Sequence, residues 1–157
     1  MGILIQGGRV VDAASQMDKI ADVYLDDGVI QEIGEKLKVK DKDDRIIDAR
    51  GMVVMPGLVD LHVHFRDPGQ TEKEDIESGS KAAARGGVTT VVAMPNTTPV
   101  IDCPDRANYV KNKAAQVSPI HVLQAGAMTK GELGCELSDI AGMAAAGVPV
   151  LSEDGKS

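Results

Sequence analysis

The sequence predicts an α/β protein in which a segment of short strands precedes alternating strands and helices. From Pro56 onward, apolar runs of strand length alternate with longer helical patterns. Continuous apolar strands joined by helices favour a parallel sheet covered by helices. Before Pro56, β-branched residues in partial alternation indicate short strands, at residues 3–5, 9–11, 22–25, 29–33, 45–47 and 52–55.

Turn and capping residues separate these elements. The run Asp26-Asp27-Gly28 is typical of a hairpin turn. A helix is predicted over 71–85, because Thr71 and Glu74 have the spacing of a capping box and two glycines follow. Further helices are predicted over 104–116, with proline in the first turn, and over 136–146. The strands expected between them are 57–62, 88–94, 120–124 and 148–151.

The βα pattern accounts for only part of a closed barrel. A (β/α)8 barrel takes roughly 250 residues, and about a hundred follow Pro56. We therefore predict two parts: residues 1–54 as a small β segment, and residues 55–157 as the first four βα units, the first half of a (β/α)8 TIM barrel.

Composition excludes several classes of function. The 157 residues carry a net charge of -7 without a basic patch, which argues against nucleic-acid binding. Cys103 and Cys135 lie far apart, as expected for reduced thiols in a cytoplasmic protein. We expect neither a signal peptide nor a membrane span, because no apolar run has the required form or length.

A His-x-His pair is the main candidate for chemistry. Alternate residues of a strand face the same side, so Asp60, His62 and His64 should point together at the carboxyl end of the first barrel strand. Two such imidazoles can bind one divalent metal such as zinc. Asp154 follows the fourth predicted strand and should reach the same rim. Taken singly, these residues also fit incidental histidines and an acidic turn.

Four motifs together resemble the dihydroorotase form of the amidohydrolase superfamily. They are Pro56–Gly69 (PGLVDLHVHFRDPG), Lys73–Ile76, Ala82–Thr97 and Ser152–Gly155. The resemblance covers the whole chain. It implies a small β-sandwich, made partly from the N-terminus, beside a (β/α)8 barrel. It also implies a zinc-dependent cyclic amidohydrolase that converts N-carbamoyl-L-aspartate reversibly to (S)-dihydroorotate in de novo pyrimidine biosynthesis.

The resemblance assigns metal ligands residue by residue. His62 and His64 would bind the first zinc, and Asp154 would bridge it to a second, as in the shorter bacterial type. Glu153 departs mildly from that motif, which often has Asp there. Other members of the superfamily use a carbamylated lysine at this strand. Residues 148–154 contain no lysine and Lys156 lies too late, so Asp154 is the expected ligand.

The resemblance also assigns substrate contacts to His64, Arg66 and Asn96. Arg66 and Asn96 would hold the substrate's free carboxylate, and a guanidinium suits that task because its planar fork grips a carboxylate bidentately. Without the resemblance, a solvated charge and a turn residue are the simpler interpretations. Supporting residues are also expected. Asp60 would orient a ligand, with a strand-end cap as the alternative, and Asp67 and Gly69 would shape the Arg66 loop. His121 should be packed or hydrogen-bonded within a strand, and the expected lining of the core or a pocket is Met94, Met128 and Met143.

Part of the implied site lies outside this sequence. The family's acid/base aspartate comes from the eighth strand, beyond Ser157, and further histidine ligands come from strands five and six. Of the two zinc ions in a complete site, this chain would ligate at most one well, so we expect the isolated chain to be inactive. Besides the small-molecule substrate, the expected partners are the missing C-terminal half, a second copy of the chain, or aspartate carbamoyltransferase.

Two other functions fit the same residues. A hydantoinase or allantoinase would share the metal site, but Arg66 and Asn96 suit a substrate that carries its own carboxylate. A non-catalytic fragment that scaffolds a partner would need none of the five candidate residues, His62, His64, Arg66, Asn96 and Asp154.

Overall fold

The computed structural model describes residues 1–156. The chain separates into two compact units, Met1–Pro56 and Gly57–Ser157. This division lies close to the boundary expected after residue 54. The identity of the two parts as a sandwich segment and a barrel segment stays a prediction. Among residues 1–156, no helix has both the length and the apolar character needed to cross a bilayer.

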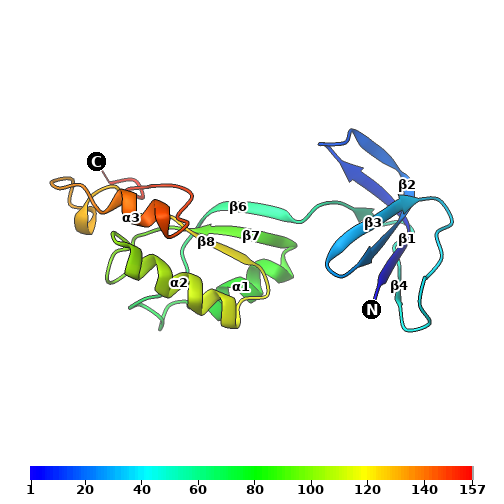
Figure 1. The fold of residues 1–157 in the computed structure, drawn as a ribbon, viewed down its shortest axis with the longest axis horizontal. Helices are drawn as coiled ribbons and strands as arrows, with labels where there is room; N and C mark the ends of the chain where they lie inside the picture. The colour runs from blue at the N-terminus through cyan, green and yellow to red at the C-terminus, as the bar shows by residue number, and fades with distance from the viewer. Residues whose placement is uncertain (157) are drawn as a thin grey trace. The chain divides into compact units, whose positions relative to one another are not determined.

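The first unit is a single mixed sheet (Figure 1). Its strand order is β3-β2-β1-β4, and β5 also pairs with β1. The pairs β1–β2 and β2–β3 are antiparallel. Strands β4 and β5 both run parallel to β1. The predicted turn at 26–28 is confirmed, since Asp27 and Gly28 both have positive φ between two antiparallel strands. The strands are β1 (Ile3–Asp12), β2 (Met17–Asp26), β3 (Val29–Gly34), β4 (Arg45–Asp48) and β5 (Val53–Val54).

The strands predicted at 3–5 and 9–11 form one strand. β1 keeps its pairing with β2 across both, with a register irregularity between Ile5 and Gly8. Gly7 lies within this irregularity at a φ of 71°, in the left-handed region that glycine tolerates best. The break predicted between two strands is therefore an irregularity within one strand.

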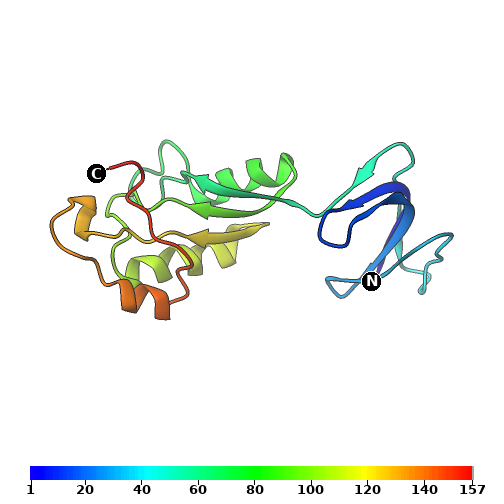
Figure 2. The same ribbon diagram turned by 90° about the horizontal axis from the view of Figure 1, so that it is seen from above.

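The second unit has a parallel three-stranded sheet in the order β6-β7-β8 (Figures 1 and 2). Helices α1 and α2 cover one face, where Ile76 and Val110 meet Val91 of the central strand in a buried apolar cluster. Phe65, the one phenylalanine, completes this core. The elements are β6 (Leu58–Val63), α1 (Ile76–Arg85), β7 (Val88–Ala93), α2 (Pro104–Val117), β8 (His121–Gln124), η1 (Lys130–Glu132) and α3 (Ile140–Ala145).

Two predicted helix starts are wrong. Helix α1 begins at Ile76, because Asp75 is its N-cap: the Asp75 carboxylate accepts the Ser78 amide at 2.7 Å. The Asp75 amide donates in return to the Ser78 hydroxyl. The capping box is therefore formed by Asp75 and Ser78, and not by Thr71 and Glu74. Helix α3 begins at Ile140, because Asp139 caps it in the same way by accepting the Gly142 amide.

The fourth predicted strand, 148–151, is also wrong as a strand. Only Leu151 pairs, in an isolated parallel bridge with Gly126. Hydrogen bonds from Gly126 N to Val150 O and from Ser152 N to Gly126 O hold the segment beside the end of β8. The segment still runs to the carboxyl end of the sheet, so the position expected for Ser152 and the residues after it is kept.

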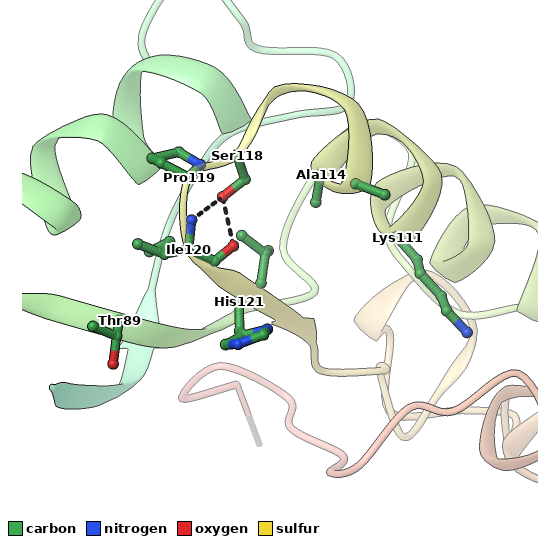
Figure 3. Close-up of a pocket in the computed structure, with 9 residues that line it drawn as sticks. Thr89, Lys111, Ala114, Ser118, Pro119, Ile120 and His121 are labelled. Atoms are coloured by element: carbon green, nitrogen blue, oxygen red, sulfur yellow. Dashed lines mark hydrogen bonds between the residues drawn. The ribbon is translucent and has the colours of Figure 1, made fainter. Parts of the chain in front are cut away.

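His121 lies at the amino end of β8, at the other end of the sheet from His62. Its ring is exposed and borders an open depression of about 550 Å³ between β8 and the end of α2 (Figure 3). There the Ser118 hydroxyl donates to the Ile120 carbonyl at 2.8 Å and accepts the Ile120 amide at 3.2 Å. His121 is therefore neither packed in the core nor close to the His-x-His pair.

Candidate metal centre

Strand β6 delivers both histidines to the carboxyl end of the sheet. His62 lies in the strand and His64 follows it directly, so the alternation of side chains places both rings on the same side. Their ring centroids are 5.1 Å apart. The Asp60 carboxylate accepts the backbone amide of His62 at 3.0 Å. This hydrogen bond joins Asp60 to the backbone at the end of the strand, and not to the imidazole ring of either histidine.

Asp154 reaches the two histidines from the C-terminal end of the second unit. It follows the bridged segment at Leu151, and its φ of 48° turns the backbone into the left-handed region. Its side chain is largely buried, at 12% exposure. Two contacts fix the neighbouring residues: Glu153 accepts the Thr129 amide at 2.6 Å, and Lys156 Nζ lies 2.7 Å from Glu132.

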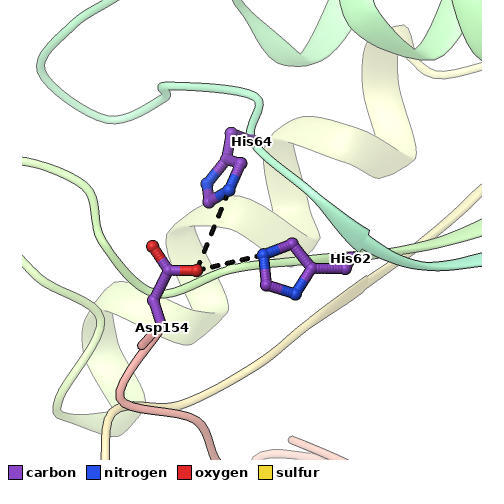
Figure 4. Close-up of side chains that lie close together, drawn as sticks. All are labelled: His62, His64 and Asp154. Carbon is purple, nitrogen blue, oxygen red and sulfur yellow. Dashed lines mark ion pairs between the residues drawn. The ribbon is translucent and has the colours of Figure 1, made fainter. Parts of the chain in front are cut away.

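The three side chains converge on one point (Figure 4). Oδ1 of Asp154 lies 3.1 Å from Nε2 of His62 and 3.8 Å from Nε2 of His64. Together they offer two imidazole nitrogens and one carboxylate oxygen within 4.8 Å of one another. The structure thus brings together the three residues that the sequence singled out as metal ligands.

Asn96, which follows β7, contacts two of these three residues. Its Oδ1 lies 3.0 Å from Nδ1 of His64, and its side-chain amide donates to Oδ2 of Asp154. Because an amide oxygen can only accept, Nδ1 of His64 carries the hydrogen in this contact, and in the neutral imidazole the lone pair is then on Nε2. That nitrogen is the one that faces Asp154.

The donor set fits a zinc ion. Zinc takes imidazole nitrogen and carboxylate oxygen at about 2.0–2.2 Å in tetrahedral geometry, which puts two of its ligands roughly 3.4 Å apart. The two nitrogen–oxygen separations at Asp154, 3.1 and 3.8 Å, lie on either side of that spacing. The contact from Asn96 also fixes one histidine in the tautomer that a metal requires.

The loop after β6 places Arg66 between two buried residues, Phe65 and Asp67. The backbone of Arg66 has a φ of 57°, in the left-handed region that side chains with a Cβ rarely adopt. None of the ion pairs within residues 1–156 involves its guanidinium. Arg66 therefore has a fixed backbone and an available charge.

The Arg66 loop is tied to the loop that carries Asn96. The Thr98 amide donates to the Pro68 carbonyl at 3.1 Å, and the Gln70 side chain donates to the Thr98 hydroxyl at the same distance. A Cβ on Gly69 would overlap the Thr98 carbonyl. The expectation that Gly69 shapes this loop has a concrete basis, since only glycine allows the two loops to approach this closely.

Sequence reasoning missed the residues that support the site from other elements. Glu132 is buried beside Lys156, and Asp67, which was expected to shape the Arg66 loop, is buried against Tyr109 and Lys113 of α2. No local pattern marks such pairs, because each depends on how distant segments pack. The prediction for the methionines is correct for Met94 and Met143, which are buried. It is wrong for Met128, which is 41% exposed.

A parallel sheet with covering helices, and with a His-x-His pair and an aspartate at its carboxyl end, defines an α/β protein with a candidate metal centre. Residues 51–157 match the family described as "Dihydro-orotase-like". The chain therefore belongs to the dihydro-orotase-like family, which confirms the resemblance seen in its motifs.

Curated relatives agree with this assignment. The chain is 54% identical over 153 residues to the dihydroorotase of Clostridioides difficile (strain 630), which covers 98% of this chain and 36% of that protein. It is 46% identical over 156 residues to the dihydroorotase of Citrifermentans bemidjiense, covering 99% and 37%. The chain thus spans just over a third of the length of these relatives.

Solved structures share the fold. The L-hydantoinase (dihydropyrimidinase) of Arthrobacter aurescens matches 81% of this chain and 28% of its own, with a TM-score of 0.71 and 30% identity. A D-hydantoinase matches with a TM-score of 0.69 and 31% identity, over 82% of this chain and 28% of its own. The mixed α/β architecture is therefore that of the hydantoinase group of amidohydrolases.

Proposed function

We propose that this chain supplies metal ligands and substrate-carboxylate ligands to a dihydroorotase, which interconverts N-carbamoyl-L-aspartate and (S)-dihydroorotate in pyrimidine biosynthesis. The observation that carries the proposal is the convergence of His62, His64 and Asp154 at the carboxyl end of the sheet. Enzymes with βα barrels have their active sites at that end. The 54% identity to a named dihydroorotase supports the choice of reaction.

In this proposal His62, His64 and Asp154 would hold zinc, and Asp154 would also serve the second zinc of the complete site. When bound, zinc lowers the pKa of its water to about 7 and polarises a carbonyl group. The protein's own part is to keep His64 in the required tautomer through Asn96 and to hold the largely buried Asp154 beside the two histidines.

Arg66 and Asn96 would recognise the free carboxylate of the substrate, beside His64. The guanidinium of Arg66 offers two parallel N–H donors to a carboxylate. Asn96 has two side-chain N–H groups, and Asp154 takes one of them, which leaves the second for the substrate. These two residues lie on neighbouring, mutually tied loops, as a shared ligand would require.

The remaining architecture follows from the same proposal. Residues 55–157 would be the first half of a (β/α)8 barrel, and residues 1–54 part of a β-sandwich. The acid/base aspartate and further metal ligands would come from residues outside this sequence, which contains three histidines in all. We expect the 157-residue chain alone to bind at most one zinc well and to be inactive; the rest of the barrel, a second copy or aspartate carbamoyltransferase would be its partner.

A hydantoinase-type activity is the second candidate, favoured by the structural likeness to L-hydantoinase. Arg66 distinguishes the two, because an available guanidinium matches a ring that carries a carboxylate. A scaffolding role without catalysis is the third candidate, and it predicts that the natural protein holds no metal.

The test compares substrates in the natural polypeptide that carries these residues. We expect zinc in the purified protein, turnover of dihydroorotate, and little turnover of hydantoin or allantoin. Arg66→Gln should raise the KM for dihydroorotate about 10- to 100-fold, the worth of one charged hydrogen-bond pair. Arg85→Gln, at the exposed end of α1, is the matched control.

Each alternative has its own result. Preference for hydantoin would replace the dihydroorotase proposal by the hydantoinase one. Absence of both metal and turnover in the natural protein would favour a scaffold. Normal turnover by the 157-residue chain alone would contradict the expectation that it is inactive.

A further inference from the structure

The loop that carries Arg66 is fastened to helix α2 by a buried carboxylate. The side chain of Asp67 has no exposed surface. Its Oδ1 accepts the Tyr109 hydroxyl at 3.0 Å, and its Oδ2 lies 2.5 Å from Nζ of Lys113. Tyr109 and Lys113 are one turn apart on α2, so both partners come from one rigid element.

The positive partner matches the buried charge. A buried carboxylate is tolerated when it is paired and hydrogen-bonded. The hydrogen bond to Asp67 raises the pKa of Lys113, which keeps the ammonium charged. The anchor is therefore an ion pair with a supporting hydroxyl rather than a single surface contact.

The anchor acts next to a strained residue. Arg66 has its left-handed backbone between Phe65, which is packed in the core, and Asp67. Such a conformation persists only where the surroundings determine it from both sides. Releasing Asp67 would let the backbone of Arg66 relax and its guanidinium move.

The pairing also removes a competitor for Arg66. An unpaired carboxylate at the next position would attract the guanidinium that the substrate needs. The Tyr109 hydroxyl donates to Oδ1 of Asp67 and the Lys113 ammonium balances its charge at Oδ2, while Arg66 takes part in none of the ion pairs of residues 1–156.

We propose that Asp67, held by Tyr109 and Lys113, is a positioning residue that presents the Arg66 guanidinium to the carboxylate of the substrate. This inference rests on the proposed dihydroorotase function. It adds to that function a set of residues outside the metal centre that supports substrate specificity. Two of them, Tyr109 and Lys113, belong to helix α2, which contributes no candidate metal ligand.

The test is a double-mutant cycle in the natural polypeptide, with dihydroorotate as substrate. Lys113→Met should raise KM about 10-fold while kcat and zinc content stay within about twofold of the wild type. In an Arg66→Gln background, Lys113→Met should change KM by less than about twofold, because the group that it positions is gone. Lys81→Met, which removes the exposed Lys81–Glu77 pair on α1, is the control.

A second variant covers the case in which Lys113→Met does not fold. Tyr109→Phe keeps the ring and removes only the hydroxyl that donates to Asp67. It should also raise KM, by a smaller factor than Lys113→Met does. An unchanged KM in both variants, or an equal effect with and without Arg66, would overturn the inference and leave the dihydroorotase function intact. A wild-type protein that does not act on dihydroorotate would overturn both.

Discussion

Nδ1 of His64 lies 3.0 Å from Oδ1 of Asn96, and the amide end of the same asparagine donates to Asp154. One side chain therefore holds two of the three candidate metal ligands, one directly after β6 and one in the segment after Leu151. The direction of both contacts is fixed, because the amide oxygen accepts and the amide nitrogen donates. This relationship gives Asn96 a role at the candidate metal centre in addition to the substrate contact expected from its motif.

Asn96→Ala should therefore weaken zinc binding as well as substrate binding. Loss of a residue that orients metal ligands lowers metal affinity about 10- to 100-fold. Competition with a chromophoric chelator measures this affinity, with Asn112→Ala on the exposed side of α2 as the control. Unchanged zinc affinity in Asn96→Ala would mean that the asparagine serves the substrate alone.

Lys156→Met should loosen the segment that carries Asp154. Its ammonium lies 2.7 Å from Oε2 of Glu132, whose side chain is fully buried and whose Oε1 has no hydrogen-bond partner within residues 1–156. Removing the lysine leaves a buried carboxylate without its charge partner, which is costly. We expect zinc affinity to fall about 10-fold and the free energy of unfolding to decrease.

A surface pair from the same region gives the matched control. Lys130 and Glu136 form an ion pair in which both side chains are mostly exposed, and such pairs contribute little. Lys130→Met should therefore leave zinc affinity unchanged. Equal chelator titrations for Lys156→Met and Lys130→Met would sink this prediction.

The hydrogen bond to Glu132 raises the pKa of Lys156. The stabilisation from the Lys156–Glu132 pair is therefore complete below the ordinary lysine pKa of 10.5 and is lost as the pH rises above the raised pKa.

Local patterns allowed the βα order to be predicted, and the family motifs allowed the convergence of His62, His64 and Asp154 to be predicted. Strand alternation placed His62 and His64 on one side, whereas Asp154 taken alone fits an acidic turn equally well. Helix starts failed where two capping solutions compete within a few residues, as at Thr71 and Asp75. The prediction of a fourth strand is wrong because the length of a strand depends on its pairing partner, and Leu151 forms only an isolated bridge.

The supporting contacts could not be predicted for a different reason. The motif gives Asp67 a place in the Arg66 loop but no partner, and its contact with Lys113 of α2 arises from the packing of the helix on the sheet. Asn96 was assigned from its motif, but its contact with His64 requires the exact spacing of two loops. Tertiary packing, which has no local signature, decides both.

Gly69→Ala should disturb both substrate loops. At a φ of 89° an alanine is strained, and its Cβ would also overlap the Thr98 carbonyl of the Asn96 loop. Gly87 is the matched control: its φ is 84°, and a Cβ there meets nothing within 4 Å. Denaturant unfolding should show a loss of about 1–2 kcal/mol for Gly87→Ala, from backbone strain alone. Gly69→Ala should lose more, and equal losses would show that the loops separate freely.

Asp44 should govern the acid stability of the first unit. Its carboxylate accepts backbone amides from Gly2, Lys40 and Asp41, and also the Tyr24 hydroxyl at 2.8 Å. These contacts, above all the Asp41 amide, lower its pKa from 3.8 to about 2. A carboxylate with a lowered folded-state pKa stabilises the fold above its unfolded value, and this stabilisation is lost as the pH falls through the folded value.

The stability difference between the wild type and Asp44→Asn should therefore be constant above pH 4 and shrink between about pH 4 and pH 2. The carboxyl carbon resonance of Asp44 followed by NMR gives the pKa directly, and Asp43→Asn at the exposed neighbouring position is the control. Tyr24→Phe removes only one of four donors, so it should raise the pKa of Asp44 only slightly. An Asp44 that titrates near 3.8 would show that the loop from Lys40 to Asp44 does not hold its carboxylate in solution.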